Sequence, residues 1–164
     1  MNLQDSWIVQ INNNYNNQND KINSKDAKFF NTTIFMDFAR FTQLYSHDCE
    51  ICNQNKILIE QLSNSLASKL QTFEGRKQIS NSFDKIANHL RKSHSLYIRR
   101  YVSSVYSAIG LAIGIACGLI TGYLTKNMLV FLSIISTIGL TIGTIAGWIK
   151  EKSLLKKGKV YGKF

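Results

Sequence analysis

Two long uncharged stretches in the second half of the chain constrain its fold more than any other feature. They are Val102–Thr125 and Met128–Ile149, and only Lys126 and Asn127 separate them. Each is longer than twenty residues, and a helix that rises about 1.5 Å per residue crosses a hydrocarbon core of about 30 Å in roughly that length. The sequence therefore predicts a transmembrane hairpin of two helices over residues 101–149.

Glycine recurs at every fourth residue in both stretches. Glycine is a poor helix former in water, whereas helices in bilayers use small residues at this spacing to bring two backbones into close contact. The predicted helix-packing residues are Gly110, Gly114, Gly118 and Gly122 in the first stretch and Gly139, Gly143 and Gly147 in the second. These two ridges predict tight packing within the hairpin, between copies of the chain, or both.

Each predicted span has a second face of small or polar residues. On the first span this face consists of Ala108, Ala112 and Ala116, and on the second it is a hydroxyl stripe of Ser133, Thr137, Thr141 and Thr144. A helix with two small faces can contact a neighbouring copy as well as its own partner, which favours a closed homo-oligomeric ring. Because neither span contains a charged residue, the hydroxyl stripe is the predicted pore lining. In the alternative, a plain anchor, the hydroxyls bond back to their own helix.

The net charge of +10 is concentrated beside the predicted spans. Residues 1–84 carry eight basic and nine acidic residues, so the excess lies in residues 85–100 and after Ile149. Basic residues flank the cytoplasmic ends of membrane helices, and this pattern predicts that the N- and C-termini are both cytoplasmic. The same charges can attract anionic lipid headgroups, so membrane lipids are expected partners.

The rest of the chain predicts an all-α cytosolic domain. Residues 1–25 are rich in Asn, lack the features of a secretory signal and predict a flexible arm. Over residues 26–100, apolar residues at three- and four-residue steps predict a bundle of about three helices, the first ending near residue 46. Gly75 predicts the break before the third helix, which we expect to run unbroken into the first span. Residues 150–164 predict a basic cytosolic tail.

Cysteine and histidine gather in two short segments of this domain. Zinc prefers four N or S ligands, and C-x2-C supplies two of them. The predicted ligands of a structural zinc ion are Cys49, Cys52, His89 and His94. A five-residue step turns His94 about 140° away from His89 on a straight helix, so His47 is an alternative fourth ligand. Reduced cysteines packed at a helix start are the competing interpretation, and a redox role lacks its usual βαβ context.

Sequence motifs of enzymes are weak in this chain. It contains no Gly-rich phosphate loop after a strand, no G-x-S-x-G and no carboxylate pair placed for acid–base chemistry. Arg40 and His47 match the spacing of the helical HEPN ribonucleases, but Phe41 stands where that family usually has a polar residue. We therefore expect no enzymatic activity.

The layout of a helical domain, a glycine-rich hairpin over residues 97–150 and basic flanks resembles the small two-transmembrane effectors of bacterial antiphage defence. These include SLATT-type and Hailong-type proteins and the membrane effectors of cyclic-oligonucleotide signalling. The resemblance implies a homo-oligomeric ion channel of the bacterial inner membrane that arrests growth on infection. It also implies gating by a nucleotide or short oligonucleotide, with Arg91, Lys92, Arg99 and Arg100 as candidate phosphate-binding residues. The alternative is an adaptor that holds a helical interaction domain at the membrane without a pore.

Overall fold

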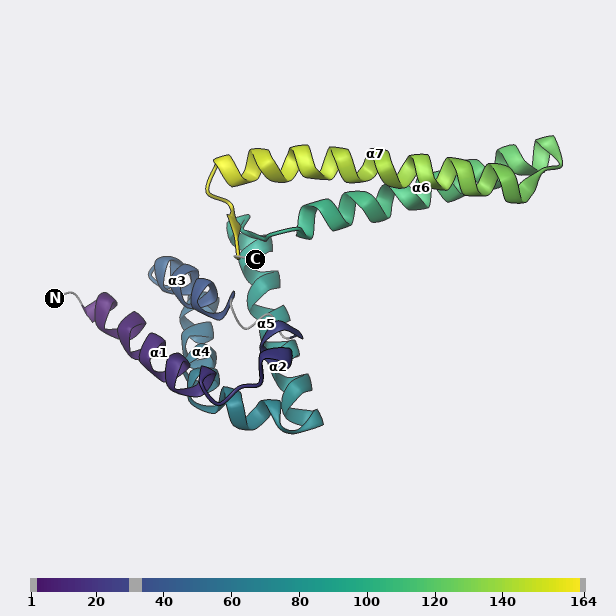
Figure 1. Ribbon diagram of the computed structural model, residues 1–164. Coiled ribbons are helices and arrows are strands. Elements are labelled where there is room, and N and C mark those ends of the chain that lie inside the picture. The colour runs from purple at the N-terminus through teal and green to yellow at the C-terminus, as the bar shows by residue number, and fades with distance from the viewer. Residues whose placement is uncertain (1–2, 30–33, 163–164) are drawn as a thin grey trace. The chain divides into compact units, whose positions relative to one another are not determined.

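The computed structural model describes residues 3–29 and 34–162, which divide into two compact units. The helical unit comprises the chain up to Leu96 together with Tyr161 and Gly162, and the hairpin unit is Tyr97–Val160. Apart from two short strands, the regular elements of both units are helices (Figure 1). The structure thus confirms an all-α fold in which a helical bundle precedes two long, apolar, packed helices.

The first helix of the helical unit, α1 (Leu3–Asn19), corrects the prediction of a flexible arm over residues 1–25. Its apolar residues are few, but Trp7, Ile11 and Tyr15 lie four residues apart and therefore share one face of a helix. Ile11 is fully buried, the ring of Tyr15 stacks on Phe35 at a centroid distance of 5.2 Å, and Trp7 lies under the ammonium group of Lys56. These contacts hold the Asn-rich segment as a helix.

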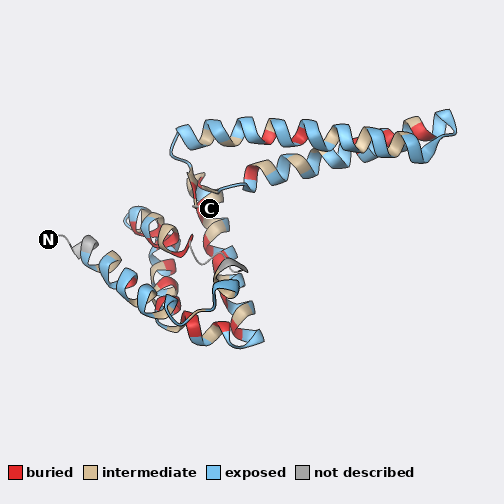
Figure 2. Cartoon of the chain, viewed as in Figure 1, coloured by how far each residue is buried: buried red, intermediate tan, exposed pale blue. Residues whose placement is uncertain are grey.

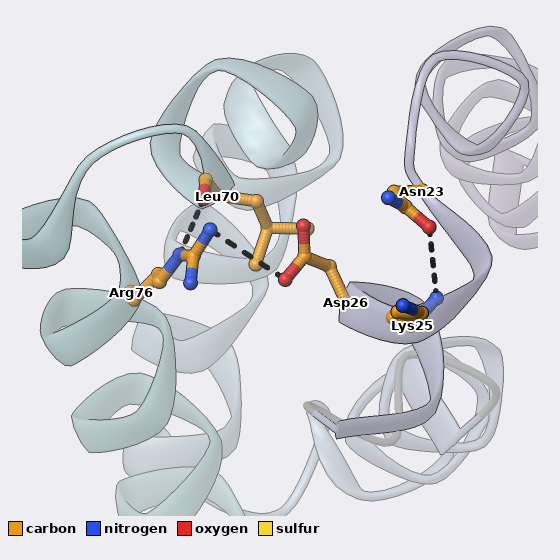
Figure 3. Close-up of polar contacts among 5 residues, drawn as sticks. All are labelled: Asn23, Lys25, Asp26, Leu70 and Arg76. Atoms are coloured by element: carbon orange, nitrogen blue, oxygen red, sulfur yellow. Dashed lines mark hydrogen bonds and ion pairs between the residues drawn. The ribbon is translucent and has the colours of Figure 1, made fainter.

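A short helix, α2 (Ser24–Phe29), and α3 (Phe35–Tyr45) occupy the region predicted as one helix up to residue 46. Residues 30–33 of that predicted helix lie outside the described residues. At the start of α2 the Asn23 side chain accepts a hydrogen bond of 3.1 Å from the Lys25 amide (Figure 3). The same view shows Arg76, which pairs with Asp26 at 3.5 Å and donates a 2.6 Å hydrogen bond to the Leu70 carbonyl.

The two longest helices of the helical unit are α4 (Glu50–Leu70) and α5 (Phe73–His94). Gly75 was predicted to mark the break before the third helix, but it lies in the first turn of α5. Its amide donates a hydrogen bond of 3.1 Å to the hydroxyl of Thr72, which caps this helix. A Cβ atom on Gly75 would collide with the backbone of Lys69. Glycine is required here because the two helix ends approach each other closely.

The prediction that the third helix continues into the first span is wrong. Helix α5 ends at His94, Ser95 adopts a left-handed conformation (φ 54°), and the Leu96 amide bonds back to the Leu90 carbonyl at 3.1 Å. This pattern terminates a helix, and here it buries the Leu96 side chain. A strand, β1 (Tyr97–Ile98), and a second left-handed residue, Arg100 (φ 68°), follow before the next helix.

The hairpin unit consists mainly of α6 (Tyr101–Thr125) and α7 (Met128–Lys156), which lie side by side (Figure 1). Both are long and apolar enough to cross a membrane. Strand β1 pairs with β2 (Val160–Tyr161), and the Tyr97 amide donates to the Lys159 carbonyl at 2.9 Å.

The last described residues belong to the helical unit and give the predicted basic tail a fixed end. Tyr161 is buried there against Phe38 and Phe41, with ring centroids 5.8 and 5.4 Å away. The Gly162 amide donates a 3.0 Å hydrogen bond to the Asp37 carboxylate. The chain therefore returns to the helical unit after the hairpin.

Candidate metal centre

Four side chains from the ends of two helices converge in the helical unit. Cys49 is the extended residue that precedes α4, and Cys52 lies in the first turn of that helix. His89 and His94 lie in the last two turns of α5. The ligand atoms of these four residues all lie within 4.8 Å of one another. The packing of α4 against α5 thus joins residues that are 37 to 42 positions apart in the sequence.

The distances within this cluster suit a tetrahedral metal site. His89 Nε2 lies 3.2 Å from Cys49 Sγ and 3.3 Å from Cys52 Sγ, and His94 Nε2 lies 3.3 Å from Cys52 Sγ. Zinc bonds of about 2.3 Å to sulfur and 2.0–2.1 Å to nitrogen put neighbouring S and N ligands roughly 3.5 Å apart in a tetrahedron. Two sulfur and two nitrogen ligands are a frequent donor set of structural zinc, so the cluster could hold such an ion.

The structure includes His94, rather than His47, in the cluster. The separation of 140° expected between His89 and His94 does not keep the two side chains apart. Their ring centroids are 5.3 Å from each other. Side chains on a helix lean toward its N-terminus, which lets His94 reach back along α5 toward His89. His47 lies exposed in the turn before α4 and is not a member of the four-residue cluster.

Burial sets the protonation of the candidate ligands. It raises the pKa of the Cys52 thiol to about 12, and the hydrogen bond and charge of Cys49 add to this effect. Burial also lowers the pKa of His89, as does the neighbouring His94, and it lowers the pKa of His94. The lowered values favour the neutral imidazoles that bind metals, whereas a cation must displace the thiol proton.

Neighbouring residues orient the two imidazoles. The second ring nitrogen of His89, Nδ1, lies 3.3 Å from the Ser93 hydroxyl, so Nε2 is left to face the cysteines. The ring of His94 stacks on Tyr45 of α3 at a centroid distance of 4.0 Å and an angle of 22°. Outer contacts of this kind fix the ring orientation of metal-binding histidines.

The predicted helix-packing residues meet within a single hairpin. Gly110 faces Gly139 and Gly143 on the opposite helix, and Gly114 faces Gly139 and Ser136. A Cβ atom at Gly118 would lie 2.9 Å from Leu132 Cα, and one at Gly147 would lie 2.7 Å from Ser103 Cα. The two glycine ridges therefore bring the backbones of α6 and α7 into contact with each other.

The predicted pore-lining residues lie exposed along α7, and each hydroxyl donates to a carbonyl of its own helix. The acceptors are Val130 for Ser133 (2.9 Å), Ser133 for Thr137 (2.7 Å), Thr137 for Thr141 (2.8 Å) and Leu140 for Thr144 (2.8 Å). Thr144 also lies 2.9 Å from the Ser107 hydroxyl of α6. These hydroxyls are satisfied without water or a second chain, so they can face lipid at little cost.

The four candidate phosphate-binding residues are divided between the two units. Arg91 and Lys92 belong to α5, and Arg91 donates a 2.8 Å hydrogen bond to the Asn88 side chain. Arg99 and Arg100 belong to the hairpin unit, in the segment before α6.

Glu151 of the hairpin has a structural role that the sequence did not predict. Glu151 accepts hydrogen bonds from the amides of Arg100 (2.7 Å) and Ser103 (3.2 Å) and from the Ser103 hydroxyl (2.7 Å). The carboxylate of α7 thereby caps the N-terminus of α6, which has no cap of its own. The signal in the sequence is slight: Glu151 is the one acidic residue after Asp84.

Comparison of the chain with models of known protein families, with curated proteins and with solved structures gives no match.

Proposed function

We propose that this protein is a membrane-anchored adaptor whose cytosolic helical domain is stabilised by one zinc ion. The observation that carries the proposal is the convergence of Cys49, Cys52, His89 and His94 in one cluster with tetrahedral spacing. The zinc would tie the start of α4 to the end of α5. Because His94 is the last residue of α5, the ion would fix the end of the domain that leads directly into the hairpin unit.

The hairpin would serve as the anchor, with both termini in the cytoplasm of a bacterial cell. Its packing supports this role because the glycines of each helix are used against the other helix of the same chain. Its outward residues are mostly large and apolar, such as Ile109, Ile113 and Ile142, which suits contact with lipid. An anchor of this kind needs no second copy and no enzymatic activity.

Metal analysis tests the zinc part of this proposal. Full-length protein purified in mild detergent should contain one zinc per chain, and the Cys49→Ser variant should contain almost none. Cys117→Ser is the matched control, because Cys117 lies exposed on α6 and is not one of the four residues of the cluster. A zinc content far below one per chain in the unaltered protein would contradict the proposal.

An ion channel is a second candidate function, and one observation favours it. Ala108, Ala112 and Ala116 remain exposed on α6 after the hairpin has formed, so a small-residue face is left for a neighbouring copy. This is the homo-oligomeric arrangement that the resemblance to antiphage effectors implies, with Ser133, Thr137, Thr141 and Thr144 toward the pore. A nucleotide or short oligonucleotide bound to the helical domain would then control opening.

Mass measurement in lipid nanodiscs separates the two functions. The anchor predicts a single chain per disc and no ion flux when the protein is reconstituted in liposomes. The channel predicts a fixed number of copies and a flux that Ala112→Leu abolishes. A stable ring that conducts ions would show that the protein is a channel and would contradict the adaptor function.

A further inference from the structure

A cavity of about 170 Å³ opens in the hairpin unit, where α6 begins and α7 ends. It is lined by Arg99, Trp148, Glu151, Lys152 and Leu155. The four residues from α7 share one face of that helix, because they are three, four and seven residues from Trp148. Arg99 comes from the short segment between β1 and α6. The cavity therefore combines two cations and one carboxylate with two large apolar side chains.

The charges in this cavity favour an anion. Both carboxylate oxygens of Glu151 are engaged by the first turn of α6, at Arg100 and Ser103. The Lys152 ammonium group lies 5.0 Å from the centre of the Trp148 ring. Lys152 and Arg99 are exposed, and the charge of Arg99 also acts on the Glu151 carboxylate. Two positive side chains against one carboxylate leave the cavity with an excess of one positive charge.

The depth of these residues matches the headgroup layer of a bilayer. Trp148 lies at the end of the uncharged stretch, where indole rings prefer the membrane interface. Lys152 is three residues beyond Ile149, which is roughly 4.5 Å along a helix. The polar layer on each side of a bilayer is about 5–7 Å thick. Lys152 is thus at the level of lipid phosphates when the uncharged stretch fills the hydrocarbon core.

We propose that this cavity binds the headgroup of an anionic phospholipid from the cytoplasmic leaflet. Arg99 and Lys152 hold the phosphate, and Trp148 contacts the glycerol and the upper part of the acyl chains. Free phosphate shares the charge but cannot use the apolar surfaces of Trp148 and Leu155. The inference rests on the membrane placement proposed above.

Fluorescence quenching tests this inference on the full-length protein. A Trp7→Phe background leaves Trp148 as the one tryptophan. Two liposome preparations contain phosphatidylcholine and phosphatidylglycerol at equal mole fractions. In one preparation the acyl chains of phosphatidylcholine carry bromine, and in the other those of phosphatidylglycerol do. We expect brominated phosphatidylglycerol to quench Trp148 more strongly, and Arg99→Gln with Lys152→Gln to remove the preference.

The control removes the same charge elsewhere. Lys150→Gln with Lys157→Gln changes two exposed lysines of the same segment that do not line the cavity, and it should keep most of the preference. Equal quenching by both lipids in the unaltered protein, or loss of preference by millimolar inorganic phosphate, would overturn the lipid site. Absence of quenching by either lipid would instead contradict the membrane placement.

Discussion

The two units of this chain bury opposite kinds of residue. In the helical unit many of the fully buried side chains are large and apolar, among them Phe35, Phe38, Ile59 and Leu66. In α6 and α7 the buried residues are Val102 and the glycines Gly114, Gly118, Gly122, Gly143 and Gly147. Figure 2 shows this contrast, with buried residues frequent in the helical unit and sparse along the hairpin. The large apolar residues of the hairpin point outward.

The difference is the one expected of a unit that lies in water and a hairpin that lies in a bilayer. In water, burying apolar area stabilises a fold by about 25 cal/mol per Å², so large side chains belong inside. Lipid tails are as apolar as leucine and give no such gain, so helices in a bilayer associate through close backbone packing. The helical unit, whose bundle is small, has the candidate metal cluster as an additional link between α4 and α5. In the hairpin the corresponding links between α6 and α7 are the Glu151 cap and the glycine ridges.

The largest effect is expected from removing a metal ligand. Cys52→Ser should abolish zinc binding and leave a polar residue in a fully buried position. Structural zinc sites contribute directly to folding, so we expect a loss of several kcal/mol in the stability of the helical unit. Hydrogen exchange at the amides of α4 and α5 measures the stability of this unit separately from that of the hairpin. Cys117→Ser should leave exchange unchanged, and an equally silent Cys52→Ser would show that the cluster holds no metal.

The second effect concerns the glycine ridges. Gly143→Leu forces a side chain against the backbone of Tyr106 and Gly110, and overpacking of this kind typically costs 1–3 kcal/mol. Exchange at amides of α6 and α7 in detergent should rise. Ala112→Leu adds similar volume on an exposed face and should have little effect. If Ala112→Leu were the more damaging change, contacts between copies would outweigh contacts within the hairpin.

A smaller effect is expected at the cap of α6. Glu151→Gln weakens three hydrogen bonds to Arg100 and Ser103, and loss of a helix cap costs typically about 1 kcal/mol. The Ser103 amide should exchange roughly fivefold faster, while amides in the middle of α6 stay protected. Lys150→Gln serves as a neighbouring control. Unchanged exchange at Ser103 would mean that the carboxylate does not hold this helix end.

The smallest effect is expected at Tyr161, where the chain returns to the helical unit. Burial, and to a lesser extent the charge of Asp37, raise the pKa of Tyr161 above its ordinary value of 10.0, and Arg91 acts in the opposite direction. The folded phenol therefore resists ionisation, so its contribution to stability is present below pH 10 and is lost as the pH rises above it. Tyr161→Phe keeps the ring contacts but should remove this alkaline loss. Denaturation at pH 8 and pH 11 compares the two proteins, and identical losses would contradict burial of the phenol.

Strong periodic patterns made most of the fold predictable. The two helices of the hairpin and the two longest helices of the helical unit follow from long uncharged runs and repeated apolar spacing. Helix α1 was missed because its apolar face consists of little more than Trp7, Ile11 and Tyr15, and its docking partners lie far along the chain. The break after His94 was missed because Ser95 and Arg100 take left-handed conformations that usually signal glycine.

The candidate metal site was predictable because its ligands are rare residues in two short segments. Sequence spacing could not choose between His94 and His47, since that choice depends on how α5 ends and how its side chains lean. The Glu151 cap and the docking of Tyr161 were not predictable, because each joins residues that only tertiary packing brings together.

X-ray absorption at the zinc edge of the full-length protein tests the central claim most directly. The account predicts stoichiometric zinc with two sulfur neighbours at about 2.3 Å and two nitrogen neighbours at about 2.0–2.1 Å. Zinc that is absent, or that is surrounded only by oxygen and nitrogen, would contradict it.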